Sequence, residues 1–358
     1  MERTVPVNLL DRDLLLRAPK VLLHDHLDGG LRPQTVLDLA ARIGHDLPTT
    51  DLDGLAAWFD QHDKGADLDR YLETFGHTVA VMQAPDALER VARECAEDLD
   101  ADGVVYAEVR FAPELATAGG LAIPEVLEAI ARGFAAGPPT ITVRQIVCGM
   151  RQEDRAGEAF AAAADACDLG VVGIDLAGPE EGFPASQHAG AIAAAREAGL
   201  HVTLHAGEAA GVGSIADAWD QGAQRLGHGV RIVDELSVGE DGTDAMGPVA
   251  RRVLAGDVTL EVCPTSNVHT GVVADVADHP IARLRDAGFR VTLNTDNRLM
   301  SGVTATSEFV TMADTFGMGL AEFEGMTLAA MDSAFLEDGQ ARAALVEQIQ
   351  RGYASLRP

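Results

Sequence analysis

The sequence has few aromatic residues and almost no lysine. Aromatic residues make up 4% of the 358 residues, yet 47% are hydrophobic, so aliphatic side chains and alanine must supply the core. A chain of this size and composition can bury one large core or two modest ones, which excludes disorder. Lysine occurs only at Lys20 and Lys64, and 56 carboxylates face 27 basic side chains, for a net charge of −29. Such a chain repels nucleic acid and anionic membranes, which are therefore not expected as partners.

The sequence also lacks paired cysteines and long hydrophobic runs. Its four cysteines, Cys95, Cys148, Cys167 and Cys263, are widely spaced in apolar stretches, a pattern typical of free thiols in a reducing compartment. Charged residues interrupt the first twenty positions, and no stretch approaches 18 uninterrupted apolar residues. We expect a soluble, cytoplasmic protein without a membrane segment.

Short β-rich apolar runs alternate with longer helical patterns along the chain. The runs are residues 21–27, 103–111, 141–148, 171–176, 201–206, 223–228, 258–263 and 290–295. Alternation of this kind favours a parallel sheet, and eight strands is the number that closes a (β/α)8 TIM-type barrel. An open, doubly wound sheet is the alternative.

Helical patterns occupy the segments between these runs. Residues 85–99 and the segment that opens at Pro124 each have a proline near the start and one apolar face, and residues 186–198 and 278–287 are similar but richer in alanine. A helical insertion is predicted at 31–84, after the first strand, and further helices follow Thr304. No repeat or linker divides the chain, so we expect one domain over 1–358.

Polar residues stand at the ends of four of the predicted strands. His24 and His26 close the first strand and share one face because side chains alternate, whereas Asp25 points away. An isolated pair of this kind is more often two hydrogen-bonded core histidines. However, His205 and Glu208 end the fifth run, His228 the sixth and Asp296 the eighth, and the carboxyl ends of barrel strands share one rim. The six side chains are therefore expected to converge.

Three neutral imidazoles and one carboxylate form a ligand set that suits Zn²⁺. We assign His24, His26, His205 and Asp296 as ligands of one zinc ion per chain. A catalytic zinc keeps a position for water and lowers the pKa of that water to roughly 7. Glu208 and His228 are left to act on the water and the substrate.

Several motifs in this order resemble the adenosine deaminase family across nearly the whole chain. They are HDHLDGG at 24–30, HAGE at 205–208, GHG at 227–229 and NTDN at 294–297, with weaker similarity in EVRFAP at 108–113, DLAG at 175–178 and CPTSN at 263–267. The resemblance implies a zinc-dependent amidohydrolase that deaminates adenosine, and 2′-deoxyadenosine, to inosine and ammonia in purine salvage.

The resemblance also implies roles for individual residues. Glu208 would protonate the purine ring nitrogen beside the attacked carbon and help the amine leave. His228 would hold the attacking hydroxide and stabilise the tetrahedral centre, and Asp296 would take the proton of the water as well as bind zinc. His26 would contact the substrate, and Gly178 would donate its backbone N–H to the ring.

Two positions bear on substrate choice. Asp28 looks like the family's contact to the ribose 5′-hydroxyl. Aspartate here favours adenosine, since relatives that act on adenine or extended nucleosides commonly carry glutamate. The simpler alternative is a turn aspartate that hydrogen-bonds its own backbone. Asn297 departs from the family, where a second aspartate commonly contacts purine N7. An asparagine amide donates to N7 without a change of protonation, so we expect binding to survive with altered base selectivity.

Other polar and aromatic residues are not assigned to the zinc site. Trp58 and Phe59 could cover a purine or form a packing stripe, and His62 or His77 could line a lid in 31–84. A surface or capping role is expected for these two histidines and for each of the remaining ones, which are His45, His188, His201, His269 and His279.

Alternative functions remain open. A two-metal amidohydrolase commonly uses a modified lysine on the fourth strand, but neither lysine falls on a predicted strand. AMP is disfavoured because no cluster of arginine or lysine flanks the motifs beyond Arg298 and the protein is strongly acidic. Adenine or a 5′-modified adenine nucleoside is an alternative substrate. A catalytically silent zinc-binding relative is disfavoured because a structural zinc has no need of Glu208. Oligomeric state is not predicted.

Overall fold

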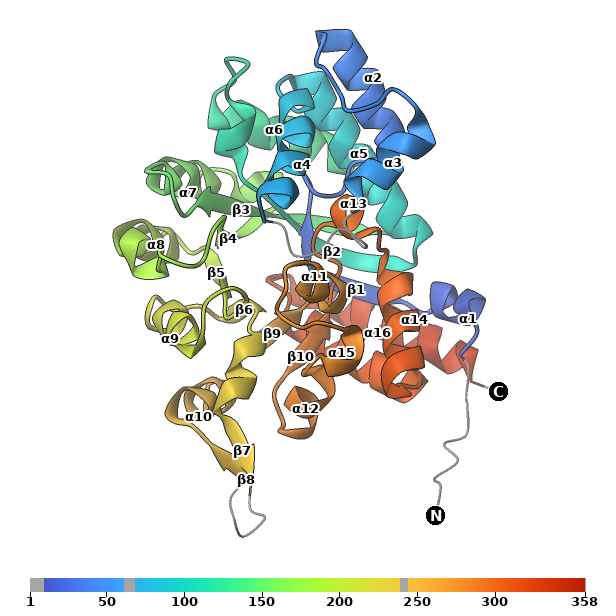
Figure 1. Cartoon of the computed structure of the whole chain (residues 1–358), viewed down its shortest axis with the longest axis vertical. Helices are drawn as coiled ribbons and strands as arrows, with labels where there is room; N and C mark the ends of the chain where they lie inside the picture. The colour runs from blue at the N-terminus through green and yellow to red at the C-terminus, as the bar shows by residue number, and fades with distance from the viewer. Residues whose placement is uncertain (1–9, 61–67, 239–243, 358) are drawn as a thin grey trace.

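The computed structural model describes residues 10–60, 68–238 and 244–357. Within these residues eight parallel strands form one sheet in the order β1-β2-β3-β4-β5-β6-β9-β10 (Figure 1). The strands are β1 Lys20–His26, β2 Val104–Phe111, β3 Thr142–Met150, β4 Val171–Ala177, β5 His201–Ala206, β6 Arg225–His228, β9 Thr259–Val262 and β10 Val291–Leu293. Each lies within two residues of the bounds that the sequence predicts.

The sheet closes on itself beside β10. Asp25 and Asp296 form a parallel bridge, in which the His26 N–H donates to the Asp296 carbonyl at 3.1 Å and the Asp296 N–H to the His24 carbonyl at 3.0 Å. The first strand is thereby joined to the segment that follows the last, which makes a (β/α)8 barrel. The predicted fold is confirmed, and the open sheet is excluded.

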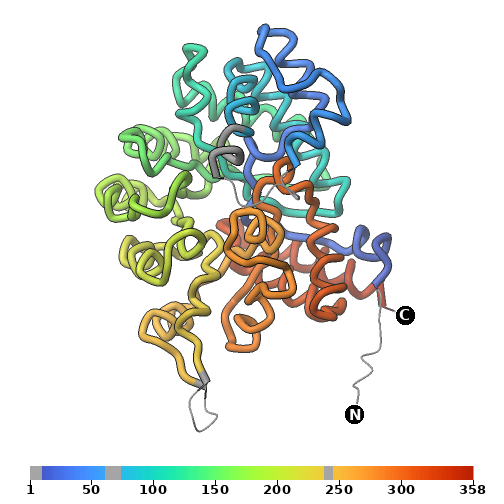
Figure 2. Tube along the Cα trace, in the orientation of Figure 1, coloured from blue at the N-terminus to red at the C-terminus, as the bar shows by residue number. Residues whose placement is uncertain are grey.

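Helices follow the strands around the outside of the barrel, in chain order (Figure 2). Their starts carry the expected signals: Pro85 and Pro124 lie in the first turns of α5 and α6, and the Glu125 carboxylate accepts the Ala122 N–H at 2.8 Å. The helices are α5 Pro85–Ala101, α6 Ile123–Ala135, α7 Ala156–Ala164, α8 Ala189–Glu197, α9 Val212–Asp220, α10 Pro248–Ala255 and α12 Ile281–Asp286. Short 3-10 helices lie in the connections, at η1 Pro113–Ala116, η2 Cys167–Leu169, η3 Ala185–His188, η4 Val230–Glu235 and η5 Val276–Asp278.

The predicted insertion and tail are helical. Helices α2 Pro33–Ile43, α3 Leu52–Phe59 and α4 Leu68–Val81 lie beside α5 and α6 (Figure 1). In α3, Phe59 is fully buried in the core and Trp58 is partly buried against it, which favours the packing role. His62 lies outside the described residues. The tail contains α13 Arg298–Ser301, α14 Ala305–Phe316, α15 Leu320–Ser333 and α16 Gly339–Leu356, and α1 Arg12–Arg17 packs against α14.

Some local features differ from expectation. An antiparallel pair, β7 Leu236–Val238 and β8 Asp244–Met246, and the short helix α11 Pro264–His269 are not predicted. Cys167 is exposed, whereas the other three cysteines are buried, and all four are free. Lys20 proves to be the first residue of β1, contrary to expectation.

The barrel interior is a packed network of charges. Arg225 donates to Glu108 at 2.5 Å and lies 2.7 Å from Glu261, and each of these side chains is at most 1% exposed. At the amino-terminal end of the strands, the buried Lys20 ammonium donates to the carbonyls of Ala18 and Asp102. The Lys20 side chain therefore helps to fill that end of the barrel. In the described part of the chain, no helix has the length and apolar character needed to cross a membrane.

Candidate active site

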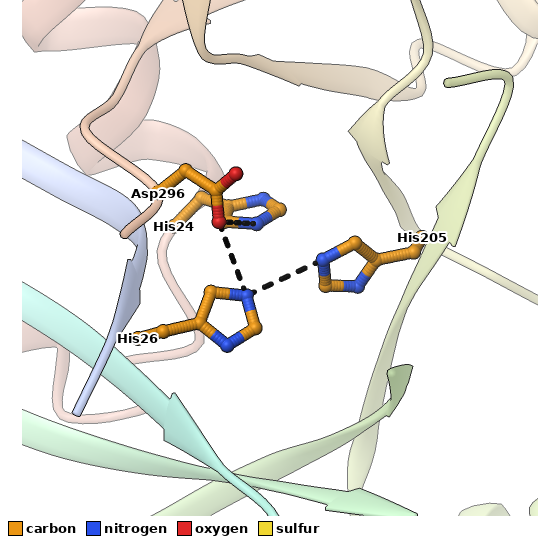
Figure 3. Close-up of side chains that lie close together, drawn as sticks. All are labelled: His24, His26, His205 and Asp296. Carbon is orange, nitrogen blue, oxygen red and sulfur yellow. Dashed lines mark hydrogen bonds and ion pairs between the residues drawn. The ribbon is translucent and has the colours of Figure 1, made fainter. Parts of the chain in front are cut away.

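Four of the predicted side chains meet at the carboxyl ends of β1, β5 and β10. His24, His26, His205 and Asp296 place one nitrogen or oxygen atom each within 4.8 Å of the others (Figure 3). Asp296 Oδ1 lies 3.5 Å from His24 Nε2 and 3.3 Å from His26 Nε2, and the Nε2 atoms of His26 and His205 are 3.4 Å apart. The alternation of β1 is as expected, because Asp25 instead accepts hydrogen bonds from Thr295 and Arg298.

Two buried carboxylates orient two of the imidazoles from behind. Glu261 Oε2 lies 3.1 Å from His24 Nδ1, and Asp175 Oδ2 lies 2.7 Å from His205 Nδ1. A carboxylate can only accept, so each Nδ1 carries the proton and each Nε2 presents its lone pair to the centre of the group. This arrangement is typical of histidines that bind a metal.

A single guanidinium links those two carboxylates. Arg110, on β2, donates to Asp175 and to Glu261 at 2.6 Å each, and all three side chains are fully buried. Burial alone would favour the neutral carboxylic acids, but the cations beside them hold the pKa values of Asp175 and Glu261 well below their usual range. Both groups therefore stay ionised acceptors.

Two of the three imidazoles, His24 and His26, are neutral, as a metal would need them to be. Burial, with help from the Arg110 charge, lowers the pKa of His24 to about 4, and burial lowers the pKa of His26 well below its usual value. For His205 burial acts in the same direction, but the Asp175 carboxylate outweighs it and the pKa is raised. A metal cation in place of a second proton on His205 would supply the positive charge that the Asp175 carboxylate stabilises, and the ring itself would stay neutral.

The residues present fit a metal ion. His24 Nε2 is buried and makes no hydrogen bond within the described chain, although it points at the carboxylate of Asp296. An unsatisfied buried nitrogen is costly, and coordination satisfies it. Three imidazole nitrogens and one carboxylate oxygen make the borderline donor set that zinc prefers.

A second group adjoins the first through Asp296. Glu208, His228 and Asp296 also bring one ligand-type atom each to within 4.8 Å of one another, and His228 Nε2 lies 3.5 Å from Glu208 Oε2. Thr270 donates to Glu208 Oε1 at 2.9 Å. His228 and Asp296 have φ angles of 61° and 59°, a left-handed conformation that is strained for residues other than glycine and that clusters at functional sites.

The predicted substrate contacts surround this pair of groups. Asp28 is buried, its Oδ1 lies 3.9 Å from His26 Nδ1, and burial raises its pKa to about 6. Gly178 has a φ of 90°, a conformation that residues with a side chain rarely adopt, so the position favours glycine. Asn297 donates to Asp296 Oδ1 at 2.8 Å. One N–H of the Asn297 amide is thus already directed at the carboxylate of Asp296, one of the four candidate metal ligands.

The other histidines divide into two sets. His45 and His77 are hydrogen-bonded to each other at 2.9 Å, and His188 lies 3.0 Å from the Arg151 carbonyl. His269 and His279 are buried rather than on the surface, at 9% and 3% exposed, and His279 has a capping role, because its Nδ1 accepts the N–H of Ile281 at the start of α12. His279 is buried because it follows η5 and packs inward, under the active-site helix α11.

The sequence reading missed several supporting residues. Besides Arg110, Asp175 and Glu261, they include Glu180, whose carboxylate accepts the backbone N–H groups of residues 207–210 and so holds the loop that carries Glu208. For Arg110, Asp175 and Glu261 the signal is a charged residue inside an apolar run, as in VVGIDLA and VTLEVC, whereas Glu180 lies in the loop sequence GPEEG and has no such signal. Charged residues inside such runs must face a polar partner in the barrel interior.

Comparison with known proteins agrees with this geometry. The adenosine deaminase family model matches residues 19–351. Adenosine deaminase of Mycolicibacterium vanbaalenii is 50% identical over 353 residues, covering 96% of this chain and 98% of that protein, and the Mycobacterium tuberculosis enzyme is 49% identical over 348 residues, covering 95% of each. The crystal structure of adenine deaminase from Arthrobacter aurescens superposes with a TM-score of 0.80 at 27% identity, over 93% of this chain and 98% of that one. The chain belongs to the adenosine deaminase family.

Proposed function

We propose that this chain is a single zinc-dependent deaminase domain, spanning 1–358, that hydrolyses adenosine and 2′-deoxyadenosine to inosine or deoxyinosine and ammonia. The observation that carries the proposal is that Asp296 belongs both to the three-histidine group and to the group with Glu208 and His228. A metal site and an acid–base pair that share one carboxylate are arranged for hydrolysis at a single carbon. The cytoplasm and purine salvage are the proposed setting.

His24, His26, His205 and Asp296 would hold one zinc ion. When bound, zinc acts as a Lewis acid that makes a water molecule acidic enough to attack at neutral pH. In this proposal the carboxylates of Asp175 and Glu261 keep two of the ligands in the tautomer that binds metal.

The protein side chains then move the protons. Asp296 accepts a proton from the attacking water, and Glu208 donates one to N1 of the purine, which makes C6 electron-poor. His228 donates a hydrogen bond to the attacking oxygen and so stabilises the negative charge that develops on it. Glu208 afterwards takes the remaining proton of the C6 hydroxyl and passes it to the amino group, so that the C6–N6 bond breaks, ammonia leaves and a carbonyl oxygen remains on C6. The proton held by Asp296 then restores Glu208.

Four residues would position the nucleoside. Gly178 offers its backbone N–H to the base, Asn297 donates to N7, His26 contacts the substrate beside the metal, and Asp28 accepts the ribose 5′-hydroxyl. The buried Asp28 Oδ1 makes no hydrogen bond within the described residues, so a substrate hydroxyl would satisfy it. An unsatisfied acceptor at Asp28 favours a nucleoside, which carries that hydroxyl, over a free base.

Adenine is the second candidate substrate, because the superposed structure from Arthrobacter aurescens is named an adenine deaminase. The two candidates separate in one assay. The ultraviolet absorbance of adenosine, 2′-deoxyadenosine, adenine, AMP and a 5′-substituted adenine nucleoside is followed after addition of the zinc-loaded protein, with a chelator and zinc restoration as controls. Turnover of adenosine that the chelator abolishes and zinc restores is expected. Turnover of adenine instead would keep the mechanism and overturn the substrate, and inactivity on all five would overturn the proposed function.

A further inference from the structure

Helix α11 and the residue after it make hydrogen bonds to every group to which we assign acid–base work. Ser266 donates to Asp296 Oδ2 at 2.5 Å, the Asn267 amide nitrogen lies 3.1 Å from His228 Nδ1, and Thr270 donates to Glu208 at 2.9 Å. Each contact comes from a side chain of one short turn of helix, so these three groups share a single support.

One of these contacts continues into a chain of hydrogen bonds that ends on a backbone group. The Asn267 amide oxygen lies 3.2 Å from His279 Nε2, and His279 Nδ1 accepts the backbone N–H of Ile281 at 3.1 Å. The three residues of this hydrogen-bond chain are buried: Asn267 is 0% exposed, His279 is 3% exposed and His228 is 1% exposed. Water therefore does not compete for these bonds.

The backbone N–H sets the direction of the whole chain because a backbone nitrogen can only donate. His279 Nδ1 must then carry a lone pair, so in the neutral ring the proton is on Nε2 and is donated to the Asn267 oxygen. The amide nitrogen of Asn267 in turn faces His228 Nδ1 and donates to it. The reverse orientation of the amide would set its N–H₂ against the His279 N–H, and neither group could accept.

His279 is neutral, as this chain requires. Burial, with a smaller effect of the His228 charge, lowers its pKa to about 3. His279 is hydrogen-bonded to Asn267 and to the backbone of Ile281, with His228 beyond the amide, and none of these residues carries a carboxylate. The ring therefore has one protonation state at neutral pH.

We propose that Asn267 and His279 are positioning residues that lock His228 in the tautomer with its proton on Nε2, so that His228 can only donate on the side of the reaction. The role of His228 rests on the proposed function, whereas the lock itself does not. With the other tautomer, His228 would turn a lone pair toward Glu208, 3.5 Å away, and would offer no proton to the attacking oxygen.

The tautomer can be read directly from the imidazole nitrogen resonances of the zinc-loaded protein labelled with ¹⁵N-histidine. The His228 signals are assigned by their loss in His228→Gln. Wild-type His228 is expected with the proton on Nε2, and a proton on Nδ1 would overturn the proposal before any further variant is made. This readout does not depend on activity.

Two pairs of variants test the relay. Asn267→Asp keeps the size of the side chain but replaces the donor with an acceptor, so His228 should take its proton on Nδ1. His279→Gln keeps an N–H for the Asn267 oxygen, whereas His279→Phe removes it at similar ring size. We expect kcat to fall about 10²-fold in Asn267→Asp, as for loss of one donor to a developing oxyanion, and a smaller loss in His279→Phe.

The controls separate positioning from damage. His279→Gln should stay within a few-fold of wild type in both kcat and tautomer, and KM and zinc content should change little in any variant. Asn267→Asp with an unchanged tautomer and unchanged kcat would overturn the proposal. If the wild-type protein turns over none of the purines, the nuclear magnetic resonance result still decides the relay, and only the proposed reaction fails.

Discussion

At the scale of single residues, Glu208 is the side chain on which the proposed reaction depends most. It is partly exposed at the rim, held by Thr270 on one oxygen and close to His228 on the other. Glu208→Gln retains this shape but cannot exchange a proton. We expect kcat to fall about 10²–10⁴-fold with zinc content unchanged, measured by the absorbance assay and by metal analysis.

The matched control is Glu181→Gln, which changes an exposed glutamate in the β4–η3 connection. It should leave kcat unchanged. A Glu208→Gln enzyme that retains near wild-type turnover would remove Glu208 from the acid–base role, whatever the identity of the metal.

Strand β5 carries two histidines, of which one is a proposed metal ligand and the other can serve as its control. His205 and His201 lie on the same strand, but His205 faces the metal-type group, whereas His201 stacks on Phe335 with ring centroids 4.5 Å apart. His205→Ala removes one of four ligands, so we expect zinc content after dialysis to fall well below one per chain. Mass spectrometry of the metal measures this, and His201→Ala should stay fully loaded. Full zinc occupancy in His205→Ala would contradict the ligand assignment.

At the scale of elements, packing between α11 and α14 places a carboxyl group where water cannot reach it. Glu308 of α14 is 1% exposed, and burial raises its pKa from 4.5 to about 7, against the opposing effect of hydrogen bonds from Thr265. Between pH 4.5 and about 7 the folded protein keeps this proton, whereas an unfolded glutamate has lost it. The contribution of Glu308 to the free energy of unfolding therefore falls as the pH rises through this range.

Glu308→Gln removes this pH dependence. Relative to wild type, the variant should gain about 1–3 kcal/mol in free energy of unfolding on going from pH 5 to pH 8, since one pKa unit corresponds to about 1.4 kcal/mol. Denaturant unfolding of both zinc-loaded proteins at the two pH values measures the difference. Glu347→Gln, exposed on α16, is the control. If the free energy of unfolding differs between Glu308→Gln and wild type by the same amount at both pH values, Glu308 is ionised at both and its pKa is not raised.

The elements also show what the sequence can and cannot predict. The eight strands are predictable because parallel strands buried on both faces appear as continuous apolar runs. The pair β7 and β8, three residues each, and the six residues of α11 are too short to show a period. The site is predictable where a side chain ends a strand, as for His24 and His205. Asn267 and His279 escape prediction because the path of the β9–β10 connection is decided by tertiary packing.

At the scale of the whole molecule, charge repulsion is the dominant long-range interaction. The 27 basic side chains can neutralise fewer than half of the 56 carboxylates, even though Arg32 already pairs with three acidic partners and Arg290 with two. Exposed pairs of this kind contribute about 0–1 kcal/mol each. The unpaired excess of negative charge therefore outweighs them and opposes the compact state.

Salt should consequently stabilise this protein. Raising NaCl from about 0.05 M to about 0.5 M shortens the screening length to a few ångströms and weakens repulsion among carboxylates that are many ångströms apart, whereas contact pairs lose less in total. We expect the Tm of the zinc-loaded protein to rise on the order of 5 °C, as measured by calorimetry. The kcat/KM for adenosine is the internal control, because an uncharged substrate is not steered by the field and its rate should stay nearly constant. A Tm that falls with salt would mean that the surface ion pairs, rather than the net charge, govern the electrostatic stability of the fold.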